Sequence, residues 1–399
     1  FALALFALAV VLFFASGIGT RGTSGEELNE LRGVSWGYDE YADYFSALAE
    51  EKGSSYAYRV LAGAPIAYGV DTHMLAHVIG YVFHKEKGAQ ALADCTPDFQ
   101  NGCAHAVVTQ ELIQNGADSL TRLMEVCAGK TERTEEYTAC FHGIGHGLIA
   151  YTAYDFKRAS EKCREVYEFL LPSQNIENAE EMWGECVGGA TMELGLGIHD
   201  KAARDLVKGI YMPDSDILMP CDAPYLAKEV RPWCYLYNRQ RFFTAAGRTA
   251  DDRVPNPETY AQALRYCAQI PPGEQDSINA CYGGFGVDFT YFANGNDGRD
   301  LGLMPDAALD NIHTWCTLAP DYNGVSACTL TAVGIVAGGK GDDMSGAVRF
   351  CRRAPDSEIS RRCFTTLIPI AREALERGEF AAFCSGIPAE HRVSCMQKD

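Results

Sequence analysis

The chain has 399 residues, of which 47% are hydrophobic and 11% aromatic. This composition is that of a folded protein with a large core, built either as two ordinary domains or as one long repeat array. The formal net charge of −19 argues against nucleic acid as a partner, because neutralising phosphates requires clustered Lys and Arg.

The first 15 residues are uninterruptedly apolar, and the last of them, Ala15, is followed by two more small residues, Ser16 and Gly17. This length suits the hydrophobic region of a signal peptide, and the small residues suit its cleavage site. A single membrane anchor that extends to about Thr20 is the alternative. We therefore assign residues 1–20 to a signal peptide or N-terminal membrane anchor, and we expect contact with a membrane only there.

Helical periodicity follows this segment. In residues 21–70, apolar side chains recur at steps of three and four, the spacing of one helix face; they are Leu28, Leu31, Tyr41, Tyr44, Phe45 and Leu48. A stronger amphipathic helix is predicted from Asp71 to Lys87, with Gly88 at its end. Almost no alternating strand pattern occurs in the chain, so we expect an all-α protein.

Sixteen cysteines then follow in eight ordered couples. In six of the couples the two cysteines are 11 to 14 residues apart. The second cysteine recurs every 32 to 48 residues, which is the period of an αα-hairpin repeat. The couples are Cys95 with Cys103, Cys127 with Cys140, Cys163 with Cys186, Cys221 with Cys234, Cys267 with Cys281, Cys316 with Cys328, Cys351 with Cys363, and Cys384 with Cys395.

An even number of cysteines at regular spacing, without tight C-x-x-C pairs, indicates disulfides formed in an oxidising compartment. The sequence leaves the connectivity open, but pairing within each couple would close loops of near-constant size. Each such bridge would stabilise the fold by roughly 2–3 kcal/mol. We therefore expect an extracytoplasmic protein, which is periplasmic, exposed on the cell surface or secreted.

Each repeat has the same predicted layout. A short helix ends near the first cysteine, as in residues 261–267, a polar loop follows, and the second cysteine opens a longer helix. Glycines crowd the first turns of these longer helices and indicate close helix approach, because Gly in a helix costs roughly 1 kcal/mol against Ala. They are Gly143, Gly145, Gly147, Gly188, Gly189, Gly283, Gly284 and Gly286. The predicted fold is an α-solenoid of about eight disulfide-pinned helical hairpins.

Two segments, residues 95–118 and 184–206, carry a resemblance to a known family. The second has a small-residue first turn, an L-G-x-G ending and a following D-K-A-A start. In these features the chain resembles Sel1-like repeats, in particular their cysteine-rich bacterial variants with disulfide-pinned hairpins. The resemblance implies a right-handed α-solenoid, which often serves as a protein-interaction surface. It implies no activity.

Five histidines, which are not part of that family's pattern, fall on equivalent positions when the repeats are aligned on the second cysteine. Two stand two residues after it and one stands six residues after it, and the helix predicted from Asp71 carries a pair at the same two offsets. The H-x-x-x-H pairs each share one helix face, and equivalent positions of consecutive repeats are neighbours in a solenoid. We therefore expect a metal site built from His73, His77, His105, His142 and His146.

Imidazoles at this spacing can ligate zinc, iron or copper, with zinc or iron expected here, or supply the axial nitrogens of haem b. Neither H-x-x-x-H pair contains the glutamate of a zincin helix. A metal hydrolase would therefore take its general base from another helix. The candidate carboxylates are Glu111, Glu193 and Asp288.

Three functions follow as hypotheses, and the sequence leaves open whether the protein is an enzyme. The first is a poly-histidine transition-metal site for metal capture or metal-dependent hydrolysis, carried by residues 71–200. Residues 201–399 would then be scaffold, because the positions equivalent to His105 and His142 hold Leu236, Gly283, Leu330 and Thr365. The second is a non-enzymatic scaffold in the cell envelope, with a peptide or envelope protein in its groove. The third is a bis-histidine haem protein that carries electrons.

Overall fold

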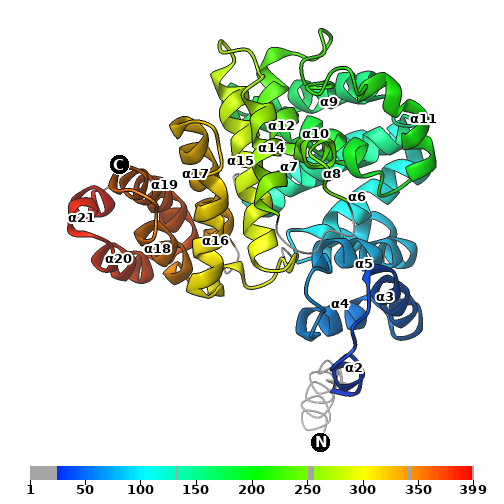
Figure 1. Ribbon diagram of the computed structural model, residues 1–399. Coiled ribbons are helices and arrows are strands. Elements are labelled where there is room, and N and C mark those ends of the chain that lie inside the picture. Colours follow the sequence, from blue (N-terminus) through cyan, green and yellow to red (C-terminus); the bar gives the residue numbers. More distant parts are fainter. Residues whose placement is uncertain (1–24, 97, 132–133, 250–255, 339–342, 398–399) are drawn as a thin grey trace, which may run out of the picture.

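The computed structural model describes residues 25–96, 98–131, 134–249, 256–338 and 343–397. Within these ranges the protein is helical throughout and has no strand, as the sequence predicts (Figure 1). No helix in the described part of the chain is both long and apolar enough to cross a membrane. The signal peptide or anchor predicted for residues 1–20 lies outside the described residues.

The first half of the chain forms helices that alternate between short and long. In chain order they are α2 (Gly25–Glu30), α3 (Tyr38–Lys52), α4 (Ser54–Gly63), α5 (Thr72–Lys87), η1 (Gly88–Ala93), α6 (Gly102–Asn115), η2 (Gly116–Ser119), α7 (Leu120–Ala128), α8 (Glu135–Tyr151), α9 (Phe156–Leu170), α10 (Ile176–Leu196) and α11 (Lys201–Tyr211). Polar N-caps start many of them. Asp71, for example, accepts a hydrogen bond from the Met74 amide and so begins α5 at Thr72.

The second half continues the same alternation. Its helices are η3 (Lys228–Val230), α12 (Arg231–Tyr237), α13 (Arg239–Ala245), α14 (Pro257–Cys267), α15 (Gln275–Ala293), η4 (Leu301–Leu303), α16 (Asp306–Cys316), α17 (Tyr322–Gly338), α18 (Ser345–Arg352), α19 (Ser357–Ala374), α20 (Arg377–Gly386) and α21 (Ala389–Met396).

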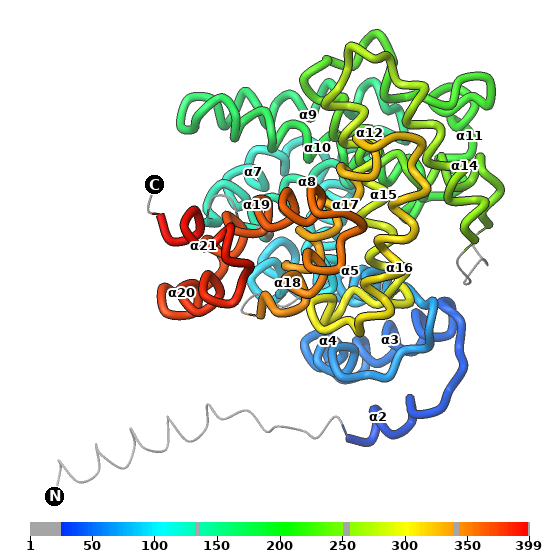
Figure 2. The backbone as a smooth tube through the Cα atoms, turned by 60° about the vertical axis from the view of Figure 1, so that its left-hand side comes forward, coloured from blue at the N-terminus to red at the C-terminus, as the bar shows by residue number. Residues whose placement is uncertain are grey.

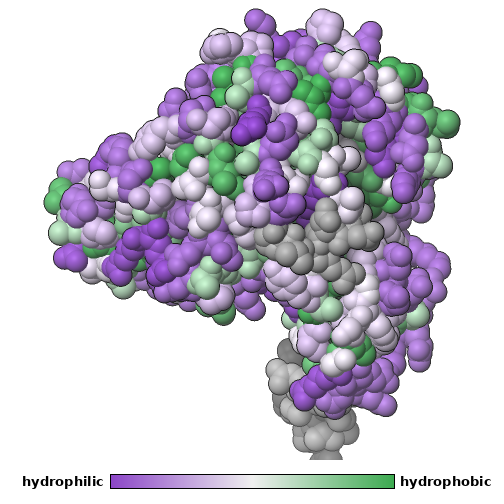
Figure 3. All heavy atoms as spheres, in the orientation of Figure 1, coloured by the Kyte–Doolittle hydropathy of each residue, from purple (hydrophilic) through white to green (hydrophobic). Residues whose placement is uncertain are grey.

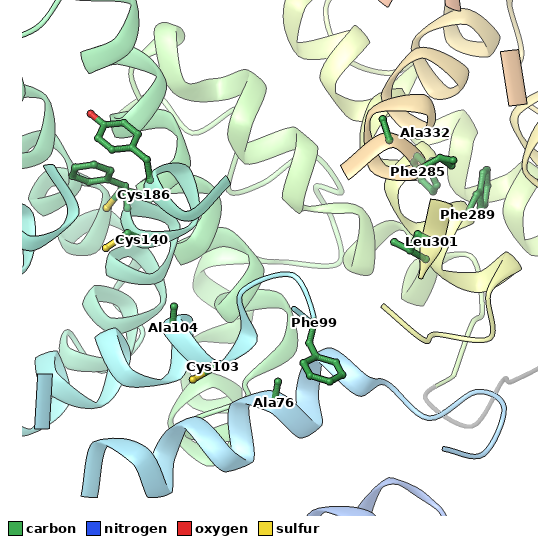
Figure 4. Packing of buried hydrophobic residues seen from close by; sticks show 14 of the residues in the cluster. Ala76, Phe99, Cys103, Ala104, Cys140, Cys186, Phe285, Phe289, Leu301 and Ala332 are labelled. Carbon is green, nitrogen blue, oxygen red and sulfur yellow. The ribbon is translucent and has the colours of Figure 1, made fainter. Parts of the chain in front are cut away.

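All eight cysteine couples are bridged, and every disulfide joins the two members of one couple, which settles the connectivity that the sequence left open. The bridges connect Cys95 to Cys103, Cys127 to Cys140, Cys163 to Cys186, Cys221 to Cys234, Cys267 to Cys281, Cys316 to Cys328, Cys351 to Cys363, and Cys384 to Cys395. Apart from the half-buried Cys95, all of these cysteines are buried. Figure 4 shows three of them, Cys103, Cys140 and Cys186, stepping from one repeat to the next. Eight intramolecular disulfides indicate an oxidising, extracytoplasmic environment.

The position of the second cysteine within its helix differs from the prediction in most repeats. Cys103 lies at the start of α6, as expected, but Cys328 and Cys363 lie well inside α17 and α19, and Cys234 lies in the middle of the short helix α12. Cys395 is almost at the end of α21. The reason is that capping groups in the preceding loop start the helix earlier than the cysteine. In α19, for example, the Asp356 side chain accepts from the Ile359 amide.

The first cysteine lies closer to its predicted place. Cys267 and Cys316 are the last residues of α14 and α16, and Cys127 and Cys351 lie in the last turns of α7 and α18. In these repeats the bridge therefore ties the end of a short helix to the interior of the longer helix that follows it.

Helix α5 and the helices that carry the second cysteines of the following five repeats pack side by side, apart from short helices between them. α5 contacts α6, α6 contacts α8, α8 contacts α10, α10 contacts α12, and α12 contacts α15. We call these six the inner helices. The shorter helices α7, α9 and α14 each pack against the long helix that follows them in the chain. This arrangement is a curved stack of hairpins in which equivalent positions of neighbouring repeats face one another.

The stack curves until its two ends meet. The loop after α15 lies against the segment before α5, so that residues more than 220 positions apart in the chain are hydrogen-bonded (Figures 1 and 2). The Gly69 amide donates to the Gly295 carbonyl at 2.8 Å. The Arg299 guanidinium donates to the carbonyls of Leu61 and Ala64 at 3.0 and 2.7 Å. We call these contacts the seam, and it closes the inner helices into a ring.

Helices α17 and α19 leave this ring. α17 packs on α15 and α19 packs on α17, with α16, α18, α20 and α21 alongside. In Figure 3 this part of the chain projects on the left, apart from the N-terminal helices at the bottom of the view. The repeats after α15 therefore form an arm rather than a part of the ring.

Glycines set the distance between neighbouring inner helices, as predicted from their clustering. A Cβ added to Gly145 on α8 would lie 1.9 Å from the Cys186 carbonyl oxygen on α10. A Cβ added to Gly189 on α10 would lie 2.0 Å from the His142 carbonyl oxygen on α8. Because both contacts are with backbone, no side chain can move away to make room. The two helices lie as close as they do because neither residue has a side chain.

Candidate metal centre

The ring brings all five predicted histidines together. His73 and His77 lie on α5, His105 on α6, and His142 and His146 on α8. Their ring centroids are 4.7 Å apart within the first pair and 5.0 Å within the second. The His105 ring lies between the pairs, with centroid distances of 5.2 to 5.7 Å to the four other rings. These five side chains form one continuous histidine cluster.

Within each H-x-x-x-H pair the Nε2 atoms face each other. They are 3.1 Å apart in His73 and His77, and 3.2 Å apart in His142 and His146. Zinc binds imidazole at about 2.0–2.1 Å, which places two nitrogens of a tetrahedral site about 3.3 Å apart. The observed separations therefore match those of two ligands on one ion.

The opposite ring nitrogens are held by fixed partners. His73 Nδ1 lies 2.7 Å from the Phe99 carbonyl oxygen, to which it must donate, so its Nε2 carries a lone pair. His142 Nδ1 lies 3.2 Å from Glu185, and His146 Nδ1 lies 3.3 Å from Glu193. For His73 and His142, anchoring one nitrogen on a carbonyl or carboxylate orients the other toward a metal, as around known metal-ligating histidines.

Among the described residues, His105 has no hydrogen-bond partner at either ring nitrogen, although it is only 6% exposed. His77 Nδ1 is also buried without a partner. An unsatisfied buried polar group costs about 1–3 kcal/mol. Unsatisfied nitrogens in the middle of a histidine cluster point to a bound ligand, such as a metal ion, as their missing partner.

A second group of polar side chains adjoins the cluster at His146. Glu193 on α10 is fully buried, and one of its oxygens is 3.3 Å from His146 Nδ1 and 3.7 Å from His199 Nε2. Its other oxygen accepts hydrogen bonds from the Tyr154 hydroxyl at 2.5 Å and from the His199 amide at 3.0 Å. The Tyr81 hydroxyl lies 2.8 Å from His199 Nδ1. His199 thus becomes a sixth imidazole of the same region, 6.5 Å from the His77 and His146 rings.

Two sets of three groups each present ligand atoms within 4.8 Å of one another. The first set is His73, His77 and His105, and the second is His146, Glu193 and His199. His142 belongs to neither set, but its ring contacts both His105 and His146.

Burial favours the neutral form of four imidazoles of the cluster. It lowers the pKa of His77 and His105 well below the ordinary value, and the neighbouring histidines lower it further. Burial likewise lowers the pKa of His142 to about 3 and that of His146 to about 4. The neutral imidazole is the form that ligates metals. The cluster is therefore ready to coordinate at neutral pH without losing a proton from these rings.

The two buried carboxylates differ in their surroundings. Burial raises the pKa of Glu185 to about 7, although the hydrogen bond that the Tyr237 hydroxyl donates to it at 3.1 Å acts to lower the pKa. Burial would also raise the pKa of Glu193, but the hydrogen bond with His146 and the charge of His199 lower it below the ordinary value. The pKa values of the two carboxylates are therefore shifted in opposite directions.

No family model, curated protein or solved structure matches this chain. The resemblance to Sel1-like repeats rests on the two segments that carry its motifs, and it concerns architecture. Any function has to be argued from the chemistry of the site.

Of the three carboxylates predicted as general bases, Glu193 alone contacts the histidine cluster within the described residues. Glu111 instead lies 2.9 Å from His84 Nε2 and 3.2 Å from the Arg122 guanidinium. Asp288 on α15 pairs with Arg239 at 2.6 Å. The role predicted for each of them stays a prediction, and the geometry favours Glu193.

Sequence reasoning missed four groups that adjoin the cluster. His199 lies in the loop between α10 and α11, after the αL residue Gly197 that ends α10, and so it falls outside the frame set by the cysteines. Glu185 directly precedes Cys186, and no other second cysteine follows an acidic residue. Tyr81 and Tyr154 carry no motif. A search for polar residues that recur one turn before or after the aligned histidines could have found Tyr81, which follows His77 by four positions.

Proposed function

We propose that this extracytoplasmic helical-repeat protein is a metalloprotein, with a transition-metal ion held by His73, His77 and His105. Zinc or iron is the expected metal, because neutral imidazoles suit both. The observation that carries the proposal is His105, a buried imidazole with neither nitrogen satisfied, surrounded by four imidazoles whose Nε2 atoms converge in pairs.

Metal-dependent hydrolysis is better supported than metal capture. Three histidine ligands leave the fourth position of a tetrahedral ion free for water, which is the arrangement of hydrolytic zinc sites. His73, which is partly exposed, lies at the edge of the cluster where solvent reaches it. A disulfide holds α6, and the close contacts of Gly80 and Gly102 hold α5 against it. Such a rigid set suits a resident ion more than one that is taken up and released.

The geometry gives less support to haem. A bis-histidine haem requires a flat apolar slot between its two axial imidazoles. In the described structure the imidazoles instead pack directly against one another, at centroid distances of 4.7 to 6.5 Å. Optical spectra provide the check, since a bound haem would give an intense Soret band.

Elemental analysis tests the proposal. Wild-type protein, purified from an oxidising compartment and dialysed, should contain stoichiometric zinc or iron. His105→Ala should lose that metal, and the double variant His142→Ala/His146→Ala should have a reduced content. His313→Ala is the matched control, because His313 is equally buried but lies on α16 in the arm, bonded to the Phe350 carbonyl.

Circular dichroism and a count of free thiols would verify that each variant folds with its disulfides intact. If the folded wild type contains no metal, and its metal-free form binds none on titration, the metal centre is refuted. The interaction scaffold would then be the remaining function.

A further inference from the structure

We propose a second metal position next to the histidine cluster, in which His146, Glu193 and His199 bind a divalent iron ion beside the ion of the three-histidine set. This inference rests on the proposed function, because it adds a neighbour to that ion. It also assigns Glu193 as a ligand and so removes it from the candidates for general base.

The three ligands come from two places in the fold that the ring brings together. His146 lies on α8 and Glu193 near the end of α10, and His199 lies in the loop that follows α10. Glu193 Oε2 lies 3.3 Å from His146 Nδ1 and 3.7 Å from His199 Nε2. The second distance is too long for a hydrogen bond, but all three ligand atoms lie within 4.8 Å of one another. They are therefore close enough to share one ion.

The buried carboxylate of Glu193 lacks a cationic side-chain partner among the described residues. Its side chain is completely buried; one of its oxygens accepts hydrogen bonds from a tyrosine hydroxyl and a backbone amide, and the other lies 3.3 Å from His146 Nδ1. Among the described residues no Lys or Arg pairs with it. Buried carboxylates are normally paired with a cationic side chain or coordinate a metal. His199 Nε2, which is buried without a hydrogen-bond partner, faces the same oxygen.

Two tyrosines hold these ligands in orientation. The Tyr154 hydroxyl fixes Glu193 Oε1, which leaves Oε2 directed toward the two imidazoles. The Tyr81 hydroxyl fixes His199 Nδ1, which leaves Nε2 for the ion. Partners of this kind around metal ligands fix the tautomer and the ring direction, and losing one typically costs 10–100-fold in metal affinity.

The two ligand sets differ in kind. Two histidines and one carboxylate form the facial set that binds non-haem Fe(II), whereas three histidines suit zinc. The sets are adjacent, since the His146 ring lies 5.7 Å from that of His105 and 6.1 Å from that of His77. The two ions would therefore be neighbours in one dinuclear centre.

Anaerobic titration of metal-free protein with Fe²⁺ in an equilibrium dialysis cell tests this inference. Wild type should bind two equivalents. Glu193→Gln and His199→Ala should each bind one, and His105→Ala should also bind one. Tyr81→Phe and Tyr154→Phe should keep two equivalents but weaken one of them by about 10–100-fold. His313→Ala, the buried-histidine control, should bind two with wild-type affinity.

The outcomes separate this inference from the proposed function. If the wild type binds one equivalent that is lost in His105→Ala and kept in Glu193→Gln, the three-histidine site stands and the second position is refuted. A single equivalent that is lost in all of these variants would mean one shared site and would also refute the second ion. If the wild type binds no metal at all, the proposed function fails.

Discussion

Replacing Gly145 by alanine should both destabilise the fold and weaken the metal centre. The new Cβ would lie 1.9 Å from the Cys186 carbonyl oxygen and 2.8 Å from the Ala190 nitrogen. Since Cβ atoms essentially never approach other heavy atoms within 3.0 Å, α8 and α10 would have to separate by about 1.1 Å. Overpacking against a rigid partner costs about 1–3 kcal/mol, and we expect the upper end because both contacts are with backbone.

Helix propensity acts in the opposite direction, because alanine is favoured over glycine by about 1 kcal/mol in a helix. The net loss in the free energy of unfolding should therefore be about 2 kcal/mol. The same separation would stretch the contact between His146 Nδ1 and Glu193, now 3.3 Å, beyond hydrogen-bond length. Affinity for the second ion, which we propose to be bound by His146 and Glu193, should fall along with stability.

The measurement is a denaturant titration followed by circular dichroism, with the disulfides intact. Gly209→Ala provides the matched control, since Gly209 also lies inside a helix, α11, but nothing lies within 4 Å of its added Cβ. This variant should be stabilised by up to about 1 kcal/mol and bind two equivalents of Fe²⁺ as the wild type should. If Gly145→Ala is as stable as Gly209→Ala, the close helix approach that we infer here is wrong.

Three further predictions concern the disulfides, the seam and pH. Cys163→Ser/Cys186→Ser opens a loop of 23 residues and should lower the free energy of unfolding by about 3 kcal/mol, roughly 1 kcal/mol more than Cys95→Ser/Cys103→Ser, which opens a loop of 8, because a longer closed loop restricts the unfolded chain more. Equal losses in chemical denaturation would contradict this dependence on loop length. Arg299→Ala removes charge-assisted hydrogen bonds to the carbonyls of Leu61 and Ala64 and should destabilise the protein by about 2 kcal/mol. Hydrogen exchange at the amides of Gly69 and Thr72 should become faster, and unchanged exchange there would show that the seam does not depend on this side chain. Hydrogen bonds from Lys52 and Tyr56 lower the pKa of Glu27 from 4.5 to about 2, so this group stabilises the fold above pH 4.5, and the contribution is lost as the pH falls toward 2. Glu27→Gln should therefore weaken the dependence of the free energy of unfolding on pH between 4.5 and 2, and an unchanged dependence would contradict this role of Glu27.

The cysteines explain how much of the fold could be predicted. Their regular spacing predicted helix pairs and favoured pairing within couples, because a bridge between the two helices of each repeat makes the cysteines recur once per repeat along the sequence. The same frame brought His73, His105 and His142 onto equivalent positions, and the structure places these residues in contact. Local spacing is sufficient for such features, since each depends on only one repeat and its neighbour. The helix starts were predicted less well, because capping groups in the loops, and not the cysteines, set them.

Other features depend on the whole stack and left no local signal. Closure of the ring results from the summed curvature of all the repeats, so nothing near Gly69 or Gly295 predicts their contact. Glu193 and Asp288 share one offset from their cysteines, yet one meets the histidines and the other pairs with Arg239, because their helices occupy different positions in the ring. His199 was missed because it lies in a connecting loop, where the cysteine frame does not apply.

The seam also changes how the protein should respond to stress. In an open repeat array each terminal unit has one neighbour, so unfolding starts at the ends and spreads inward. Among the six inner helices no such end exists, because α5 is held through the loop after α15 as well as by α6. Opening any one unit must break contacts on two sides at once. We therefore expect the ring to unfold as a single cooperative unit, while the arm, which has a free end at α21, frays first.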